Sequence, residues 1–149
     1  MTKPKLDLEI FDTKTSFADI GLSAPLLKSI DKAGFDHPTV IQSKLIPLAL
    51  SGADILGQSR TGSGKTAAFG LPAIQILQEE DAFGSLILVP TRELAIQVCH
   101  ELRELGRFTK IHPVPIYGGQ KITTQIEKLK ANPQIIVGTP GRVMDLHQR

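Results

Sequence analysis

Four short apolar runs, each separated from the next by a segment with helical spacing, constrain the fold of this chain most strongly. Leu86 to Val89 form an unbroken apolar run, which predicts a strand buried on both faces of a parallel sheet. Pro113 and Pro115 predict that the third run lies at a sheet edge or is irregular. Alternation of strands and helices predicts a doubly wound α/β fold. The runs occupy residues 53–57, 85–89, 111–117 and 134–137.

Helical segments precede and separate these runs. A short helix capped by Ser23 should end at Gly34, and a second helix should follow Pro38 and end at Gly52. Pro47 is expected to kink or divide the second helix, because proline lacks the amide hydrogen that a helix needs. The apolar residues expected to face the core are Leu26, Leu27 and Ile30 in the first helix, Ile41, Leu45, Leu48 and Ala49 in the second, and Leu94, Val98, Leu102 and Leu105 in a helix that begins near Thr91.

The composition limits the class of protein. A chain of 149 residues, 41% hydrophobic and 21% charged, fits one globular domain with a buried core. The formal net charge of +2 is too small to indicate nucleic acid, so that case rests on specific residues. The chain has neither a signal peptide nor an apolar stretch of about 20 residues, which predicts a cytoplasmic protein without membrane contact. Residues 1–15 mix charged and apolar residues and are expected to form a flexible arm before a domain at 16–149.

The cysteine and histidine content argues against a disulfide and against zinc. Cys99 is the only cysteine, so no internal disulfide can form. It lies beside the apolar face of a predicted helix and is expected to be a buried structural thiol rather than a nucleophile. The four histidines show no metal-ligand spacing.

The polar turns of the chain fall where strands end and helices begin. In open parallel sheets, ligands bind at this edge of the sheet. The sequence therefore predicts one functional edge, formed by the turns at residues 59–64, 90–92, 118–119 and 139–142.

A phosphate-binding loop is the clearest functional motif. Residues 59–66 read Ser-Arg-Thr-Gly-Ser-Gly-Lys-Thr between the first apolar run and a helix. Gly62 and Gly64 allow successive amides to point at phosphate oxygens, and the helix adds its N-terminal amides. Lys65 would neutralise the β and γ phosphates and the Thr66 hydroxyl would hold Mg²⁺. Ser59 stands where the general pattern has glycine, and a glycine-rich turn without ligand is the alternative.

A candidate adenine-binding pair lies upstream of this loop. Gln42 lies 23 residues before Lys65, and Phe35 lies seven before Gln42. A side-chain amide both donates and accepts, so it can pair with the two adjacent polar groups of adenine but not with those of guanine. Phe35 offers a flat surface for stacking. From spacing alone, Phe35 as an ordinary core residue and Gln42 as a surface residue remain open.

Five motifs occur in a fixed order along the chain. They read Gly-Phe-x-x-Pro-Thr-x-Ile-Gln at 34–42, Thr-Gly-Ser-Gly-Lys-Thr at 61–66, Pro-Thr-Arg-Glu-Leu-Ala at 90–95, Gly-Gly at 118–119 and Thr-Pro-Gly-Arg at 139–142. Together with an isolated upstream aromatic, Phe17, they resemble the DEAD-box ATP-dependent RNA helicases over 126 of the 149 residues. The resemblance implies the first part of a RecA-like P-loop NTPase domain, with an adenine-recognition segment at 17–42.

The resemblance implies roles for individual residues. Phe35 would stack on adenine, Gln42 and Thr39 would read or support it, and Phe17 would brace that side. ATP phosphates and Mg²⁺ would be held by Ser59, Arg60, Thr61, Gly62, Ser63, Gly64, Lys65 and Thr66. An RNA backbone, contacted without sequence preference, would be bound by Pro90, Thr91, Arg92, Gly118, Gly119, Thr139, Pro140, Gly141 and Arg142. Two alternatives stay open: Thr91 could simply cap its helix, and Arg92 could pair with a nearby carboxylate.

The family's acidic motif, Asp-Glu-Ala-Asp, does not occur in this chain, which ends seven residues after Arg142. The sequence is therefore expected to be a piece of an RNA helicase that binds nucleotide and RNA but does not hydrolyse ATP alone. A stand-alone ATP- and RNA-binding module is the alternative, and a metabolic P-loop kinase is a distant third. The sheet should lack at least one strand and expose an edge, which predicts marginal folding, with the piece either monomeric or prone to association.

Overall fold

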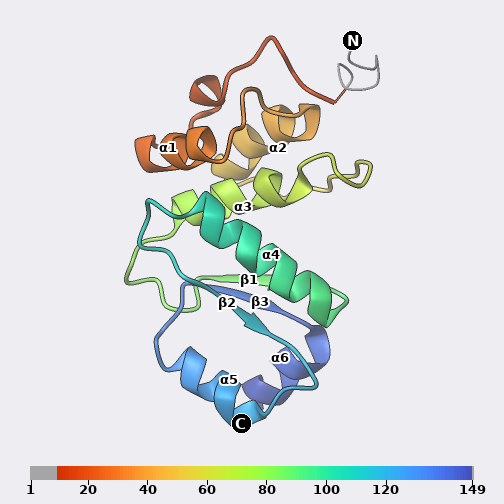
Figure 1. The fold of residues 1–149 in the computed structure, drawn as a ribbon, viewed down its shortest axis with the longest axis vertical. Coiled ribbons are helices and arrows are strands. Elements are labelled where there is room, and N and C mark those ends of the chain that lie inside the picture. The colour runs from red at the N-terminus through yellow and green to blue at the C-terminus, as the bar shows by residue number, and fades with distance from the viewer. Residues whose placement is uncertain (1–9, 149) are drawn as a thin grey trace. The chain divides into compact units, whose positions relative to one another are not determined.

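The computed structural model describes residues 10–148 and divides into two compact units, with the boundary between Ile76 and Leu77 (Figure 1). The single domain expected at residues 16–149 is thus divided between the two units. The first unit contains a 3-10 helix, Phe17–Ile20, and the helices α1 (Ala24–Lys32), α2 (Val40–Leu50) and α3 (Lys65–Ile76). The second contains β1 (Ser85–Leu88), α4 (Arg92–Leu105), β2 (Pro113–Ile116), α5 (Ile122–Leu129), β3 (Ile135–Gly138) and α6 (Pro140–His147).

The first two predicted helices are confirmed, with two corrections in α2. Gly34 and Gly52 follow the helix ends with φ of +76° and +80°, the left-handed conformation typical of a helix C-terminus. Pro47 lies inside α2, which runs unbroken from Val40 to Leu50, so Pro47 does not divide the helix. The buried face of α2 carries Gln42 and Ile46, whereas Leu48 is exposed, so the apolar stripe was assigned to the wrong face. The reason is that α2 packs against α3 through the face that carries Gln42.

The strand expected at residues 53–57 is not formed. These residues have no regular secondary structure and are exposed, and Leu56 is fully exposed. A strand requires a neighbour to bond its amides and carbonyls. No described residue pairs with this segment in a ladder, so its apolar composition does not make it a strand here.

The end of the expected N-terminal arm is attached to the first unit. Phe11 forms an antiparallel bridge with Thr39. The Asp12 amide donates to the Pro38 carbonyl and the Val40 amide to the Ile10 carbonyl, both at 2.8 Å. Residues 1–9 of the arm lie outside the described residues.

The second unit is built on a parallel sheet of three strands in the order β1-β3-β2. The chain crosses the sheet in one direction from β1 to β2, through α4, and returns in the other direction from β2 to β3, through α5. Right-handed crossovers therefore place α4 and α5 on opposite faces of the sheet, as Figure 1 shows. The parallel α/β architecture expected from the sequence is thus confirmed. β2, which contains Pro113 and Pro115, lies at a sheet edge as expected.

The core of the second unit lies mainly on one face of this sheet. Ile135 and Val137 of β3 are fully buried, as is the face of α4 that carries Val98 and Leu102. By contrast, Leu86 and Leu88 of β1 are 53% and 55% exposed, so the prediction that this strand is buried on both faces is wrong. In the parallel register these leucines share a face with β3 residues Ile136 and Gly138, and no residue described in the second unit covers that face over β1.

Cys99 is fully buried on α4, as expected for a structural thiol. Burial raises the pKa of its thiol. Among residues 10–148, no cluster of three or more His, Cys, Asp or Glu side chains is arranged to hold a metal ion. No helix within the same range is long and apolar enough to cross a membrane.

Candidate functional site

The glycine-rich loop of residues 59–66 leads into the start of α3 in the first unit. Gly62 and Gly64 have φ of +76° and +80°, which residues with a Cβ rarely adopt. Helix α3 begins at Lys65, so the amides of its first turn have no partner within the helix. The expected loop-to-helix geometry is confirmed, although the segment before the loop is not a strand.

Lys65 turns back onto the loop in this state. Its Nζ donates to the carbonyl oxygens of Ser59 and Arg60 at 2.5 and 2.8 Å. The hydroxyls of Ser59 and Ser63 share a hydrogen bond of 2.6 Å. The loop therefore supplies oxygen acceptors to its own lysine, and an incoming phosphate would have to replace them.

Gln42 connects the glycine-rich loop to the start of α2. Its Oε1 accepts from the Thr39 amide at 2.9 Å, and its Nε2 donates to the Gly64 carbonyl at 3.1 Å. The Thr39 hydroxyl in turn accepts from the backbone N–H of Gln42, which completes a capping box. A Cβ on Gly64 would collide with Gln42 Nε2. The sequence indicated an adenine contact for Gln42 but gave no sign of this contact with the loop.

Two aromatic side chains stack near the start of the chain. The rings of Phe17 and Phe35 have centroids 6.4 Å apart and planes inclined by 23°. Phe17 is 5% exposed, whereas Phe35 is 42% exposed. Phe17 therefore supports one side of Phe35, and part of the Phe35 ring remains free for a ligand.

A hollow of about 550 Å³ lies beside the glycine-rich loop in the first unit. It is lined by Ser59, Arg60 and Thr61 from the loop and by Thr39 and Lys44 from α2 and its cap. Hydroxyls and two cationic side chains could bind an anionic group here, while Ile10, Val40 and Ile41 make part of the lining apolar.

Arg92 opens α4 in the second unit and lies over the ring of Tyr117. The guanidinium carbon is 5.2 Å from the ring centroid, within the range of a cation–π interaction. Its Nη1 lies 3.7 Å from the position of a Cβ on Gly119. No ion pair between Arg92 and a carboxylate is found among the described residues. Thr91 does cap α4, because its hydroxyl accepts from the Leu94 amide at 3.2 Å.

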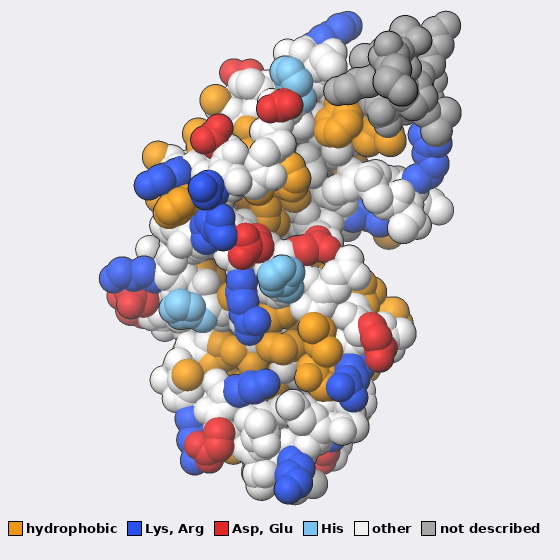
Figure 2. All heavy atoms as spheres, viewed as in Figure 1, with side chains coloured by type: hydrophobic (Ala, Val, Ile, Leu, Met, Phe, Trp, Pro, Cys, Tyr) orange, Lys and Arg blue, Asp and Glu red, His pale blue; other side chains and the backbone are white. Residues whose placement is uncertain are grey.

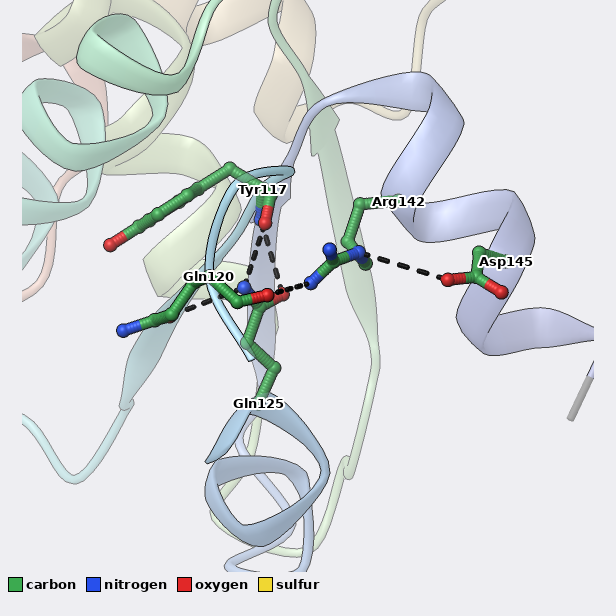
Figure 3. A network of polar contacts seen from close by, with 5 residues as sticks. All are labelled: Tyr117, Gln120, Gln125, Arg142 and Asp145. Atoms are coloured by element: carbon green, nitrogen blue, oxygen red, sulfur yellow. Dashed lines mark hydrogen bonds and ion pairs between the residues drawn. The ribbon is translucent and has the colours of Figure 1, made fainter. Parts of the chain in front are cut away.

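The turn that contains the glycine doublet is held by a network of polar contacts (Figure 3). Gln125 of α5 accepts from the Tyr117 amide at 3.2 Å and donates to the Tyr117 carbonyl at 2.7 Å. Its Nε2 also lies 3.2 Å from Gln120 Oε1. The Gln120 carbonyl accepts from Arg142 Nη1 at 3.0 Å. The network thus joins the doublet to the start of α6.

Arg142 is more enclosed than a free phosphate ligand would be. Its side chain is 15% exposed, and its Nε lies 3.8 Å from Asp145 Oδ2. One guanidinium nitrogen bonds the Gln120 carbonyl and another faces Asp145, so part of the five-donor group remains for an external acceptor. The hydroxyl of Thr139, which precedes α6, makes no capping hydrogen bond.

At two positions in these motifs, the fold does not require a glycine. A Cβ on Gly118 or Gly141 would meet no atom within 4 Å, and neither residue has a positive φ. Gly141 lies in the first turn of α6, where glycine is less favourable than alanine. Packing and backbone conformation within the chain therefore do not require glycine at either position.

The structure places the two groups of predicted residues in different units. All the candidate nucleotide residues, from Phe17 to Thr66, belong to the first unit, and all the candidate RNA residues belong to the second. Tyr117, Gln120 and Gln125 were missed from the sequence. Gln125 carried a signal, because it lies three residues after Ile122 and four before Leu129, on the apolar side of α5.

Charge alone does not mark the second unit as a binding surface. Figure 2 shows Lys and Arg side chains dispersed over the visible face of this unit, among acidic and hydrophobic ones. A nucleic-acid contact would therefore depend on individually placed groups and not on a single basic patch.

Comparison with known proteins gives consistent matches. A family model described as DEAD/DEAH box helicase matches residues 39–149. The DEAD-box ATP-dependent RNA helicase CshA of Geobacillus kaustophilus is 48% identical over 132 residues, which are 88% of this chain and 28% of the relative. RhpA of Helicobacter pylori, with the same description, is 45% identical over 148 residues, which are 97% of this chain and 30% of the relative. This chain spans less than a third of either protein.

Solved structures share the fold. A DEAD box protein from the hyperthermophile Methanococcus jannaschii has a TM-score of 0.83 at 46% identity and covers 87% of this chain and 36% of its own. A hypothetical ATP-dependent RNA helicase from Sulfolobus tokodaii has a TM-score of 0.78 at 37% identity, with 85% of this chain and 37% of its own covered. The expectation of a partial RecA-like fold is confirmed.

Proposed function

Because this chain belongs to the DEAD/DEAH box helicase family, we propose that it is the part of an ATP-dependent RNA helicase that contacts adenine nucleotide and RNA. The first unit would bind ATP with Mg²⁺, and the second unit would bind the RNA backbone. Unwinding or remodelling of RNA would be the activity of the longer protein, since its relatives extend well beyond the matched region.

The phosphate loop fits the phosphates of ATP. Gly62 and Gly64 hold the loop in left-handed conformations just before a helix N-terminus, where amides attract anions. Lys65 would exchange the carbonyls of Ser59 and Arg60 for β and γ phosphate oxygens. The Thr66 hydroxyl would be the ligand this chain offers to Mg²⁺, and the metal would neutralise charge that develops on the phosphates.

The exposed part of Phe35 and the remaining polar capacity of Gln42 support adenine recognition. The contact with Gly64 uses one hydrogen of Gln42 Nε2 and the contact with Thr39 uses one lone pair of Oε1, so one donor and one acceptor site remain on a side chain that is 4% exposed. These suit adenine, while guanine presents the opposite polarity at the corresponding position. Since Gln42 also bonds the Gly64 carbonyl, adenine binding and loop conformation would be linked.

The RNA assignment rests on the two glycines that the fold does not require. Gly118 and Gly141 leave bare backbone in the turn after β2 and at the start of α6, where a side chain would keep a ligand away. Glycine allows close approach of a ligand to the backbone. Amides at a helix start, a Thr139 hydroxyl that makes no capping hydrogen bond, and arginines bind phosphates and carry no base sequence. An extended phosphate backbone is the ligand that fits all these groups.

We propose that residues 1–149 alone bind without turning over ATP. The chain contains no Asp-Glu-Ala-Asp tetrad to hold the metal and orient water, and phosphate binding alone does not stabilise the transition state. The alternative is a stand-alone binding module. The coding sequence after Arg149 separates them: a reading frame that continues into an acidic strand favours the helicase, and an immediate stop codon favours the module.

Two titrations test the proposal. Calorimetry with ADP and GDP should show preference for ADP, and equal affinities would refute the adenine assignment. Binding of single-stranded RNA should weaken as salt rises, because phosphate contacts release counterions. Binding insensitive to salt, or marked preference for one base sequence, would refute the role of the second unit.

A further inference from the structure

Gln125 is the most enclosed polar side chain near the glycine doublet. It is fully buried on α5, and its amide makes three hydrogen bonds (Figure 3). A buried amide without partners is costly, and here both ends of the amide are paired. The bonds all go to one short segment, Tyr117 to Gln120, so Gln125 is matched to that segment rather than to its own helix.

The contacts of Gln125 replace a missing strand neighbour. β2 ends at Ile116 and lies at the edge of the sheet, so the next residue, Tyr117, has no strand beside it on that side among residues 10–148. Gln125 accepts from the Tyr117 amide and donates to the Tyr117 carbonyl. One side chain thus forms both hydrogen bonds that a neighbouring backbone would form, and it fixes the peptide groups on either side of Tyr117.

Fixing Tyr117 and Gln120 also fixes the two arginines. The Tyr117 ring lies under the Arg92 guanidinium, and the Gln120 carbonyl accepts from Arg142. Gly118 and Gly119 lie between these two points. All three candidate RNA-contacting motifs of the second unit therefore meet at the segment that Gln125 holds.

We propose that Gln125 is a positioning residue for RNA binding, which sets Arg92, the glycine doublet and Arg142 in register with successive phosphates. This inference rests on the proposed RNA function. Gln125 is fully buried and does not touch the RNA itself. Its effect is transmitted through the backbone of Tyr117 and the side chain of Gln120.

The chain offers a matched control in a second buried glutamine. Gln134 is 5% exposed, accepts from the His112 amide and donates to the Glu79 carbonyl, in the same unit. None of these partners belongs to a candidate RNA motif. Gln125→Leu and Gln134→Leu both remove a buried, backbone-bonded amide, so they should destabilise the fold by similar amounts, and only the first releases the turn.

The experiment measures binding of single-stranded oligouridylate to the full chain and to both variants between 50 and 200 mM salt, with the folded fraction determined by circular dichroism. For folded Gln125→Leu we expect about tenfold weaker binding, the effect of losing one hydrogen bond to a charged group. The slope of log affinity against log salt should fall by about 0.7 for each phosphate that the variant no longer binds. Gln134→Leu should keep both values.

Several results would overturn the inference. Unchanged affinity and slope in folded Gln125→Leu, or an equal loss in Gln134→Leu, would show that the amide only supports the fold. If Gln125→Leu does not fold, Gln120→Ala decides, because it removes the third contact of Gln125 at a half-buried position. That variant should bind RNA more weakly, and full affinity would refute positioning. If the unaltered chain shows no salt-dependent RNA binding, the proposed RNA function itself fails, whereas binding that ignores Gln125 leaves that function intact.

Discussion

Gly141→Ala should strengthen the fold and weaken RNA binding. Gly141 is the second residue of α6, a Cβ there would meet no atom within 4 Å, and its φ is not positive. Stability and binding should therefore change in opposite directions at this position. Such a result separates a ligand-imposed glycine from one that the fold requires.

The expected magnitudes follow from the surroundings of Gly141. Alanine in place of an exposed helical glycine stabilises a protein by about 0.5–1 kcal/mol, because glycine loses more conformational freedom on folding. For a chain of this size the gain corresponds to a rise in Tm of roughly 1–4 °C. The added methyl group would stand where a phosphate approaches the first amides of α6. Loss of one charge-assisted hydrogen bond there corresponds to roughly tenfold weaker binding.

The assay combines thermal unfolding with RNA titration at fixed salt. Thr123→Ala is the control, because Thr123 is exposed on α5 and alanine is also the better helix former there. This control should raise Tm without changing RNA affinity. If Gly141→Ala raises Tm and RNA affinity stays unchanged, no phosphate approaches α6. If Gly141→Ala instead lowers Tm, the glycine has a structural role and the reasoning fails.

Four further results are expected. Gln42→Ala should narrow the preference for ADP over GDP in calorimetry by about 2- to 12-fold, the value of one hydrogen bond, and an unchanged ratio would exclude adenine reading. Gly64→Ala should lower Tm, because its φ is +80° and its Cβ would collide with Gln42 Nε2, whereas normal melting would contradict this packing. Cys99 should react with iodoacetamide at pH 8 only as fast as the protein unfolds, because burial raises its pKa and disfavours the reactive thiolate; rapid labelling of folded protein would contradict its burial. Phosphate release from ATP should be the same for the chain and for Lys65→Ala. Turnover that depends on Lys65 would show that carboxylates of this chain take part in hydrolysis, and Asp145 would be the first to test.

Local patterns predicted the helices and the parallel sheet. The spacing of Val98 and Leu102 predicted the buried face of α4, and Pro113 and Pro115 placed β2 at an edge. These inferences succeeded because helix faces and proline restrictions depend on residues close together in the chain. Helix α2 was assigned the wrong face because Gln42, a polar residue, is buried through contacts with a loop 22 residues away.

The predicted strands depended on what lies beside them. Leu86 and Leu88 have the composition of a buried strand, yet one face of β1 is open, and residues 53–57 form no strand at all. Hydrophobic composition shows that a segment can form a buried strand. Whether it does so depends on neighbouring strands and helices, which no local pattern specifies. β1 lies at an edge of the sheet among the described residues, and association between chains through this edge stays a prediction.

The candidate site was only partly visible for the same reason. Glycines, Lys65 and the arginines follow recognisable short motifs, whereas Tyr117, Gln120 and Gln125 act through contacts that appear only after folding. The sequence also gave no sign that Lys65 would bond the carbonyls of Ser59 and Arg60. Motifs identify groups that bind ligands, and the groups that position them must be read from the structure.

The assignment of nucleotide motifs to residues before Leu77 and of RNA motifs to residues after it has a consequence for cooperativity. If neither unit influences the other, ADP should slow amide hydrogen exchange only before Leu77, and RNA only after it. Any slowing across that boundary shows that the units are coupled. The coupling free energy follows from the affinities, because linkage requires ADP to change RNA affinity by the same factor as RNA changes ADP affinity. The size of that factor in residues 1–149 would show how strongly nucleotide binding and RNA binding are coupled within this part of the chain.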